Sequence, residues 1–415
     1  MISKILHIQS KNRTPTDLIA KLEDFEYVEG EAINPQTIIN KSNVSLYCLD
    51  PQKQRAIFVE TPLDIDISQP PFFYQAQYEY AQRLFAVPFK ELRQLARSIE
   101  PIKEIIIIYS VGRCGSTLLS KVFNQVDSVL SLSEPDVFSQ LVGMRSPDGS
   151  NDDRITELLG FCLAFLRKKM GRQEYLFCAI KLRSFCIHLG DLINLLVPYA
   201  KVIFLYRNAE DTVKSYMRAF PFVNELLPTI EANIDLDSRW KQWDLVIRGK
   251  PLEKFLNPAP SILPITNLFV SYPSRFIPLL NDYANYIDFK NCIDLYTTLW
   301  LSVMERYLLL YKQRIPTCAI RYEDLVAEPH QIVTLIFEKC AIPITEVVDA
   351  CKVFEKDSQS GSHFSQENTR KNQITRSDIV EIRQKVNKLL KKNPEIQTPD
   401  FIVPGTFTLP APGLT

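Results

Sequence analysis

A run of apolar residues that leads into a glycine-containing turn gives the first sign of chemistry in this chain. The sequence from Ile105 to Leu119 reads IIIIYSVGRCGSTLL, which predicts a strand, a turn and a helix that opens with Ser116 and Thr117. Backbone N–H groups at a helix N-terminus, together with the helix dipole, bind phosphate and other anions. The common nucleotide-binding loop, GxxxxGK[ST], has a lysine before its hydroxyl residue, whereas the cation here is Arg113. We therefore predict an anion-binding loop that does not hold the Mg²⁺-bound β- and γ-phosphates of ATP.

A second pair of residues suited to phosphate follows another apolar run. Residues 201–218, KVIFLYRNAEDTVKSYMR, predict a buried strand that ends at Arg207 and a helix that starts near Ala209. Ser215 lies eight residues after Arg207, well inside that helix, so it can face the same crevice. A guanidinium offers two parallel N–H groups to phosphate oxygens, and a hydroxyl adds a further donor. The alternative is a helix-capping ion pair between Arg207 and Asp211.

The segments that must position these residues alternate between strands and helices. Strands are predicted at Ile105–Tyr109, Val129–Leu132, Tyr175–Ile180, Val202–Tyr206 and Thr317–Ile320, and helices from Ser116, Ile155, Ala209, Asn291 and Pro329. Short, continuously apolar strands are typical of a parallel sheet that is covered on both faces. The predicted fold class is therefore α/β, with three layers (α/β/α) around a central parallel sheet. Such sheets bind ligands outside the carboxyl ends of their strands.

Residues 1–100 differ from the rest of the chain. They contain two strand-like pieces, Val44–Leu49 and Arg55–Val59, then a turn with two prolines and an aromatic-rich stretch from Phe72 to about Ser98. The spacing of apolar residues in that stretch predicts a helix. We interpret residues 1–100 as an α+β N-terminal extension that packs on the main domain.

The main domain is predicted to cover residues 101–397. Within it, the region 220–278 is rich in prolines and aromatic residues and is predicted to be a lid or substrate cap. Residues 398–415 contain four prolines, and we expect no regular secondary structure there.

Composition excludes several classes of function. The 415 residues include 48 Lys+Arg and 48 Asp+Glu, so no global charge favours nucleic acid or an anionic membrane. The nine cysteines form no CxxC pair, which is typical of reduced core residues in a cytoplasmic protein rather than of disulfides or zinc ligands. The N-terminus lacks the apolar segment of a signal peptide, and no apolar run approaches the ~18 residues of a membrane span. We expect a cytoplasmic protein without nucleic-acid partners; the oligomeric state is not predicted.

The two phosphate motifs together resemble those of the sulfotransferases that use 3′-phosphoadenosine-5′-phosphosulfate (PAPS). In that family a [KR]xGxT loop binds the 5′-phosphosulfate, and an Arg and a Ser eight residues apart bind the 3′-phosphate. The residues that match here are Arg113, Cys114, Gly115, Ser116 and Thr117, followed by Leu118, and then Arg207 and Ser215. Arg321–Leu325, RYEDL, resembles a later segment of the family's core. The resemblance implies PAPS as cofactor and the sulfotransferase variant of the P-loop-containing nucleoside triphosphate hydrolase-like fold.

Two features depart from the family pattern. Cytosolic members carry Lys-x-His before the 3′-phosphate motif, with the His as base. Lys181 matches the lysine that contacts the sulfuryl group, but Arg183 stands where the His would be, and arginine does not accept a proton at physiological pH. The family's late RKGxxGDWK segment is also absent. Its candidate replacement is the polar stretch Gly361–Lys371, with Arg370 or Lys371 near the nucleotide.

The general base must therefore come from elsewhere. Our candidate is Glu134, in a Ser-Glu-Pro sequence after the second predicted strand, because some bacterial sulfotransferases are similar in using a Glu in this region. A base role requires desolvation that raises the pKa of this carboxyl. His188 is the second candidate. The alternative interpretations are that Glu134 caps the following helix and that Lys181 is a solvated strand-end charge.

The predicted reaction is in-line transfer of the sulfuryl group of PAPS to a hydroxyl or amine of a small, partly apolar acceptor, which leaves adenosine 3′,5′-bisphosphate (PAP). We expect no metal, because the sulfuryl group carries less charge than a γ-phosphate and cationic side chains suffice. One alternative is a P-loop kinase or NTPase, which needs Mg²⁺ and no 3′-phosphate. Another is a catalytically degenerate nucleotide-binding protein, which the missing Lys-x-His favours.

Overall fold

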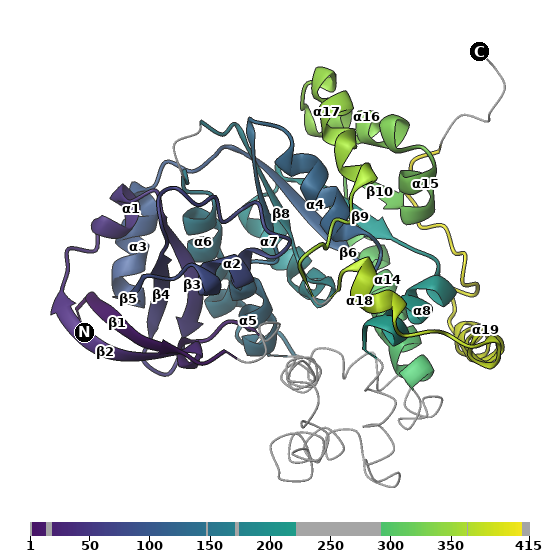
Figure 1. The fold of residues 1–415 in the computed structure, drawn as a ribbon, viewed down its shortest axis with the longest axis horizontal. Helices are drawn as coiled ribbons and strands as arrows, with labels where there is room; N and C mark the ends of the chain where they lie inside the picture. The colour runs from purple at the N-terminus through teal and green to yellow at the C-terminus, as the bar shows by residue number, and fades with distance from the viewer. Residues whose placement is uncertain are drawn as a thin grey trace, which may run out of the picture.

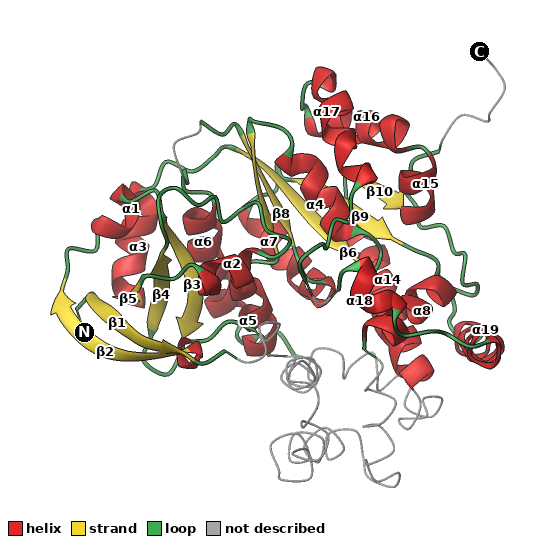
Figure 2. Ribbon diagram, viewed as in Figure 1, coloured by secondary structure: helices red, strands yellow, loops and turns green. Residues whose placement is uncertain are grey.

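The computed structural model describes residues 2–13, 19–146, 148–170, 174–220, 292–362 and 364–408. The predicted lid at 220–278 lies outside these residues from position 221 onward. Within the described residues the chain forms two five-stranded sheets, one antiparallel and one parallel, which lie side by side with helices around them (Figures 1 and 2).

The parallel sheet has the strand order β10-β9-β6-β8-β7 and contains all five strands predicted for the α/β domain. Its central strand, β6, pairs with β8 and β9, so that Ile107 lies between Ile180 and Val202. The four isoleucines of β6 are each at most 1% exposed, so both faces of the strand are covered, as its apolar run predicts. The bounds are β6 Glu104–Ser110, β7 Val129–Ser133, β8 Phe177–Lys181, β9 Lys201–Tyr206 and β10 Cys318–Arg321.

Helices pack against this sheet and extend from the ends of its strands. The predicted helix starts at Ser116, Ala209 and Pro329 are confirmed, and the helix predicted from Ile155 begins at Asp152. The helix predicted from Asn291 is described from Cys292. The bounds are α4 Ser116–Asn124, α5 Asp136–Met144, α6 Asp152–Leu166, α7 Gly190–Leu196, α8 Ala209–Ala219, α14 Cys292–Lys312, α15 Tyr322–Ala327, α16 Pro329–Cys340, α17 Val347–Cys351, α18 Gln366–Arg370 and α19 Arg376–Leu390, with 3₁₀ turns at Ser184–Leu189, Ile344–Glu346 and Lys352–Glu355.

The N-terminal residues form the antiparallel sheet, in the order β2-β1-β5-β4-β3. Both strands predicted here are confirmed as β3 and β4, but the prediction of one helix from Phe72 to Ser98 is wrong. Strand β5 divides it, because these residues pair with β1 and β4 and alternate between the two faces of the sheet. The bounds are β1 Lys4–Lys11, β2 Phe25–Ala32, β3 Val44–Asp50, β4 Arg55–Glu60, β5 Arg83–Pro88, α1 Thr37–Asn40, α2 Phe73–Glu79 and α3 Phe89–Ser98, with a 3₁₀ turn at Leu22–Asp24.

Helices α5 and α6 lie beside the N-terminal sheet (Figure 1), and one side chain of α5 and one that follows α6 bond to the N-terminal region. The Gln140 amide pairs with the backbone of Leu49 on edge strand β3, accepting from its N–H at 2.8 Å and donating to its carbonyl at 3.1 Å. Lys168 is buried, and its Nζ donates to the carbonyls of Ile38, Lys41 and Val44 at 2.8, 2.5 and 2.8 Å. One hydrophobic core runs through both sheets.

Residues 398–408 cover the other edge of the parallel sheet. The N–H of Ala319 on β10 donates to the carbonyl of Gly405 at 2.8 Å, and the N–H of Phe407 donates to the carbonyl of Ala319 at 3.1 Å. These bonds form an isolated parallel bridge between Ala319 and Thr406 rather than a further strand. Among the described residues, no helix is both long and apolar enough to cross a bilayer.

Candidate active site

The loop between β6 and α4 depends on one glycine and one arginine with unusual backbone angles. Gly115 has a φ of +81°, and a Cβ there would lie 2.5 Å from the ring of Tyr322. Both the conformation and the space therefore require glycine. Arg113 has a φ of +61°, a conformation that is uncommon for non-glycine residues and concentrated at functional sites. Ser116 and Thr117 form the first turn of α4, where backbone N–H groups lack partners within the helix.

Cys114 contributes its backbone to this loop rather than its thiol. Its Sγ donates to the carbonyl of Val111 at 2.7 Å inside the core. Burial raises the pKa of the thiol to about 12, so the thiol stays protonated and unreactive at neutral pH.

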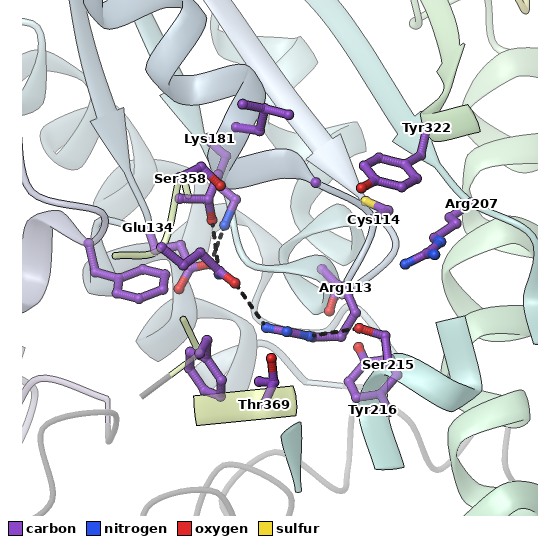
Figure 3. Close-up of a pocket in the computed structure, with 18 of the residues that line it drawn as sticks. Arg113, Cys114, Glu134, Lys181, Arg207, Ser215, Tyr216, Tyr322, Ser358 and Thr369 are labelled. Atoms are coloured by element: carbon purple, nitrogen blue, oxygen red, sulfur yellow. Dashed lines mark hydrogen bonds and ion pairs between the residues drawn. The ribbon is translucent and has the colours of Figure 1, made fainter. Parts of the chain in front are cut away.

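Arg207 and Ser215 lie beside this loop, as Figure 3 shows. The guanidinium of Arg207 stacks on the ring of Tyr322 at 4.7 Å, and the Ser215 Oγ accepts a hydrogen bond from the Arg113 Nε at 3.3 Å. Burial, together with the nearby positive charge of Arg207, lowers the pKa of Arg113. An anion bound between the two arginines would relieve this repulsion. The two predicted anion sites are thus one continuous surface.

Lys181 and Glu134 come from the ends of the neighbouring strands β8 and β7. The Lys181 Nζ is paired with the Glu134 carboxylate (Figure 3). The N–H of Glu134 also donates to the carbonyl of Lys181 at 2.7 Å, with Glu134 held at a φ of +59°. The Arg183 Nε lies 3.5 Å from the second carboxylate oxygen of Glu134.

The pKa of Glu134 is shifted in the opposite direction from the one that a base role was expected to require. Burial alone raises the pKa of Glu134, but the charges of Lys181 and Arg183 outweigh burial and hold this pKa below its ordinary value. Glu134 is therefore a carboxylate at neutral pH. It is in the correct state to accept a proton, but its two cations must loosen before it becomes a stronger base.

These residues line one cavity of about 570 Å³ at the carboxyl ends of β6, β7, β8 and β9. The predicted site residues that line it are Arg113, Cys114, Gly115, Thr117, Leu118, Glu134, Lys181, Arg207 and Ser215. Four others, Ser116, His188, Arg370 and Lys371, are not among the described residues that line it. The His188 carbonyl accepts from Arg145 at 2.5 Å outside the cavity. Arg370 and Lys371 bond to their own segment, at Gln366 and Asn368.

Several residues that line this cavity were not predicted as site residues from the sequence. The Gln359 Oε1 accepts from Arg113 at 3.4 Å, and its Nε2 donates to the Thr117 Oγ1 at 3.5 Å, so its side chain spans the loop between β6 and α4. The ring of Phe364 lies 5.1 Å from the Arg113 guanidinium carbon. Phe364 belongs to the predicted nucleotide segment Gly361–Lys371, but the contact with Arg113 comes from this aromatic residue rather than from Arg370 or Lys371. Nothing in the sequence indicated a contact between Tyr322 and the loop, although Tyr322 belongs to the recognised segment RYEDL.

One wall of the cavity is aromatic. The ring of Phe364 lies 6.1 Å from that of Phe72 and 5.4 Å from that of Phe220. Tyr74 and Phe185 line the same cavity. Cationic and aromatic groups therefore face one space, in which an anion and an apolar molecule can meet.

Comparison with known proteins places this chain in a family. The family model of the sulfotransferase domain matches residues 103–394. No curated protein matches the chain. A solved sulfotransferase domain from the curacin biosynthetic pathway is 15% identical, with coverage of 71% of this chain and 98% of that chain and a TM-score of 0.35. A sulfotransferase domain from the Synechococcus PCC 7002 olefin synthase is 12% identical (68% and 93% coverage, TM-score 0.32), and so is a mouse sulfotransferase complexed with PAP (73% and 90%, TM-score 0.33). Because the family model covers more than half of the sequence, the chain belongs to the sulfotransferase family.

Proposed function

We propose that this chain moves the sulfuryl group of PAPS to a hydroxyl or amine of a small-molecule acceptor. The loop from Arg113 to Leu118 would hold the 5′-phosphosulfate, and Arg207 with Ser215 would hold the 3′-phosphate. The observation that carries the proposal is the hydrogen bond from Arg113 to Ser215, which joins the two anion-binding motifs into one surface. A nucleotide with anionic groups at both ends of its ribose fits such a surface.

Lys181 and Glu134 supply the remaining chemistry in this proposal. PAPS brings a sulfuryl group whose bridging oxygen leaves with the phosphate as PAP. Lys181 turns from Glu134 to a sulfuryl oxygen and offsets the charge that develops there. Glu134, relieved of one cation, accepts the proton of the acceptor hydroxyl as the new O–S bond forms and the old one breaks. When PAPS binds, this ion pair would break, and Glu134 would become a stronger base.

The aromatic wall supports a partly apolar acceptor. The aromatic rings of Phe72, Tyr74 and Phe364 line the same cavity as Glu134. Ring surface binds apolar groups through burial and stacking, while the carboxylate meets the acceptor's single polar group. We propose an acceptor that presents a hydroxyl or amine on an apolar body.

The test is the affinity for PAP. Arg207→Ala is expected to weaken PAP binding by about 1.5–3 kcal/mol, or roughly 10- to 150-fold, because a charge-assisted contact to the 3′-phosphate is lost. Arg321→Ala is the matched control: it also removes an arginine at the end of a parallel strand, but one paired with Asp400 and Glu323 outside the cavity. Calorimetry with PAP measures both. Unchanged PAP affinity in Arg207→Ala, or thermal stabilisation by ATP–Mg²⁺ but not by PAP, would contradict the proposal.

A further inference from the structure

The Lys181–Glu134 pair is one end of a longer row of buried charges. Positive and negative side chains alternate along it from the N-terminal sheet to the active site. In order, they are Asp24, Arg13, Asp136, Arg183, Glu134 and Lys181. All but Glu134 are at most 9% exposed, and the Glu134 side chain is 14% exposed. Three positive and three negative charges leave the row neutral.

Asp136 is the centre of this row. Its Oδ2 lies 3.4 Å from an Arg13 guanidinium nitrogen, and its Oδ1 lies 2.9 Å from an Arg183 guanidinium nitrogen. The backbone N–H of Ala20 also donates to Asp136 Oδ2 at 2.9 Å. Two partners of this carboxylate, Arg13 and Ala20, thus lie between β1 and β2. The third, Arg183, also contacts Glu134.

Tyr74 holds the two arginines from another direction. The guanidinium carbons of Arg13 and Arg183 lie 4.9 and 4.5 Å from the centre of its ring. Arg13 is also bonded to the Tyr47 hydroxyl at 3.1 Å. Arg13, Tyr47 and Tyr74 precede residue 103, where the match to the sulfotransferase family begins.

We infer that Arg13 and Asp136 are positioning residues for sulfuryl transfer: together they fix how much of the Arg183 charge reaches Glu134. The inference rests on the proposed function. Arg183 has two carboxylates to pair with, and Asp136 shares its own charge between Arg13 and Arg183. Removing either Arg13 or Asp136 therefore changes the pairing of Glu134 without touching a residue of the anion-binding loop.

The sign of each change follows from the charges. Asp136→Asn removes a neighbouring negative charge and leaves Arg183 to Glu134 alone, so Glu134 holds its proton less tightly. Arg13→Gln leaves Arg183 as the remaining arginine beside Asp136, so more of the Arg183 charge goes to Asp136 and less to Glu134, and Glu134 holds its proton more tightly. The charged and titratable groups that face Glu134 are Lys181, Arg183, Arg113, Asp136, Tyr216 and Cys186.

The experiment is the pH dependence of PAP release from PAPS with water as the acceptor, from about pH 3 to pH 8.5, because the pKa of Glu134 lies below its ordinary value. We expect the acid-side loss of rate to move up by about one pH unit in Arg13→Gln and down in Asp136→Asn. Arg13→Lys keeps the charge and is expected to keep the wild-type profile. PAP affinity, measured by calorimetry, should stay near that of the wild type in all three. If Asp136→Asn does not fold, the contrast between Arg13→Gln and Arg13→Lys remains decisive.

Arg145→Gln is the matched control. Arg145 is also mostly buried and paired with two carboxylates, Asp152 at 2.7 Å and Asp191 at 2.9 Å, but it does not line the cavity. It should lose stability and keep its pH profile. Profiles that coincide in all variants, or that move in the same direction for Arg13→Gln and Asp136→Asn, would overturn the inference while PAP binding still depends on Arg207. Loss of that dependence would instead overturn the proposed function.

Discussion

Arg113 and Glu134 carry opposite charges, and both have a positive φ angle, which is uncommon for residues other than glycine. Their φ angles are +61° and +59°. Such conformations cost about 1–3 kcal/mol each and persist only where the surroundings fix them. For Glu134 the fixing contacts are its N–H bond to the Lys181 carbonyl and its ion pairs with Lys181 and Arg183. The main chain therefore sets the positions of these groups, and side-chain rotation sets only the final contact.

Gly115 gives the sharpest single-residue prediction. Gly115→Ala is expected to weaken PAP binding by roughly tenfold or more, because the new Cβ displaces Tyr322 and with it the stacked Arg207. Gly361→Ala is the control, since Gly361 shares the φ of +81° but a Cβ there meets no described atom within 4 Å. Both variants should lose about 1–2 kcal/mol of stability from backbone strain. Equal PAP affinities of the two variants in calorimetry would contradict this role of Gly115.

At the scale of elements, Lys168 connects the end of α6 with the segment around α1. Lys168 follows α6, and its Nζ lies within hydrogen-bond distance of three backbone carbonyls of the N-terminal region. Burial lowers the pKa of Lys168 to about 7. In the unfolded chain the same group titrates near pH 10.4, so the unfolded state binds more protons between these two values, and stability from this residue rises with pH over that range.

Lys168→Met is expected to lower the free energy of unfolding by about 2 kcal/mol or more at pH 9, because buried carbonyls lose their donor. The matched control is Lys169→Met, which removes the exposed neighbouring lysine and should change stability by less than about 0.5 kcal/mol. Urea titrations at pH 7 and pH 9 measure both. The wild type should gain up to about 2.7 kcal/mol over Lys168→Met between these pH values. A constant difference would show that Lys168 does not titrate in this range.

The elements that sequence could predict are those whose signal is local. The strand Ile105–Tyr109 is a continuous apolar run, and the Asn208 side chain caps the helix that begins at Ala209, where it accepts from the N–H of Glu210 and of Asp211. Strand β5 was missed because its partners β1 and β4 decide its conformation, and β1 lies far away in the sequence. The same limit applies to the site, because Arg13 reaches Asp136 across 123 positions.

At the scale of the whole molecule, the larger of two hydrophobic clusters runs through both sheets, and the smaller one lies within the N-terminal region. The N-terminal sheet packs on α5 and α6 through β3, and other residues of the N-terminal region supply Phe72 and Tyr74 to the cavity and Arg13 to Asp136. Its apolar residues and those of the parallel sheet are therefore expected to fold together.

A chain that starts at residue 101 should test this unity. It would expose the apolar faces of α5 and α6 and leave Asp136 without Arg13 and Ala20. We expect loss of the cooperative thermal transition and of PAP binding, because uncovered apolar surface and a buried carboxylate that keeps only Arg183 of its three partners both destabilise the fold. Circular dichroism melts and calorimetry measure the two properties. A fragment that melts cooperatively and binds PAP like the full chain would show that the parallel sheet folds alone.

The reciprocal bonding of Gln140 with Leu49 bears on how such a chain can be recombined. Residues 103–394 match the family, and a cassette cut at those positions looks like a transferable unit. Its α5 helix, however, carries a side-chain amide that completes a strand outside the cassette. Exchange with another sulfotransferase at residue 102 would separate the two partners. A crossover in a loop after α6 keeps Gln140 and Leu49 from the same parent and is expected to yield more folded chimaeras.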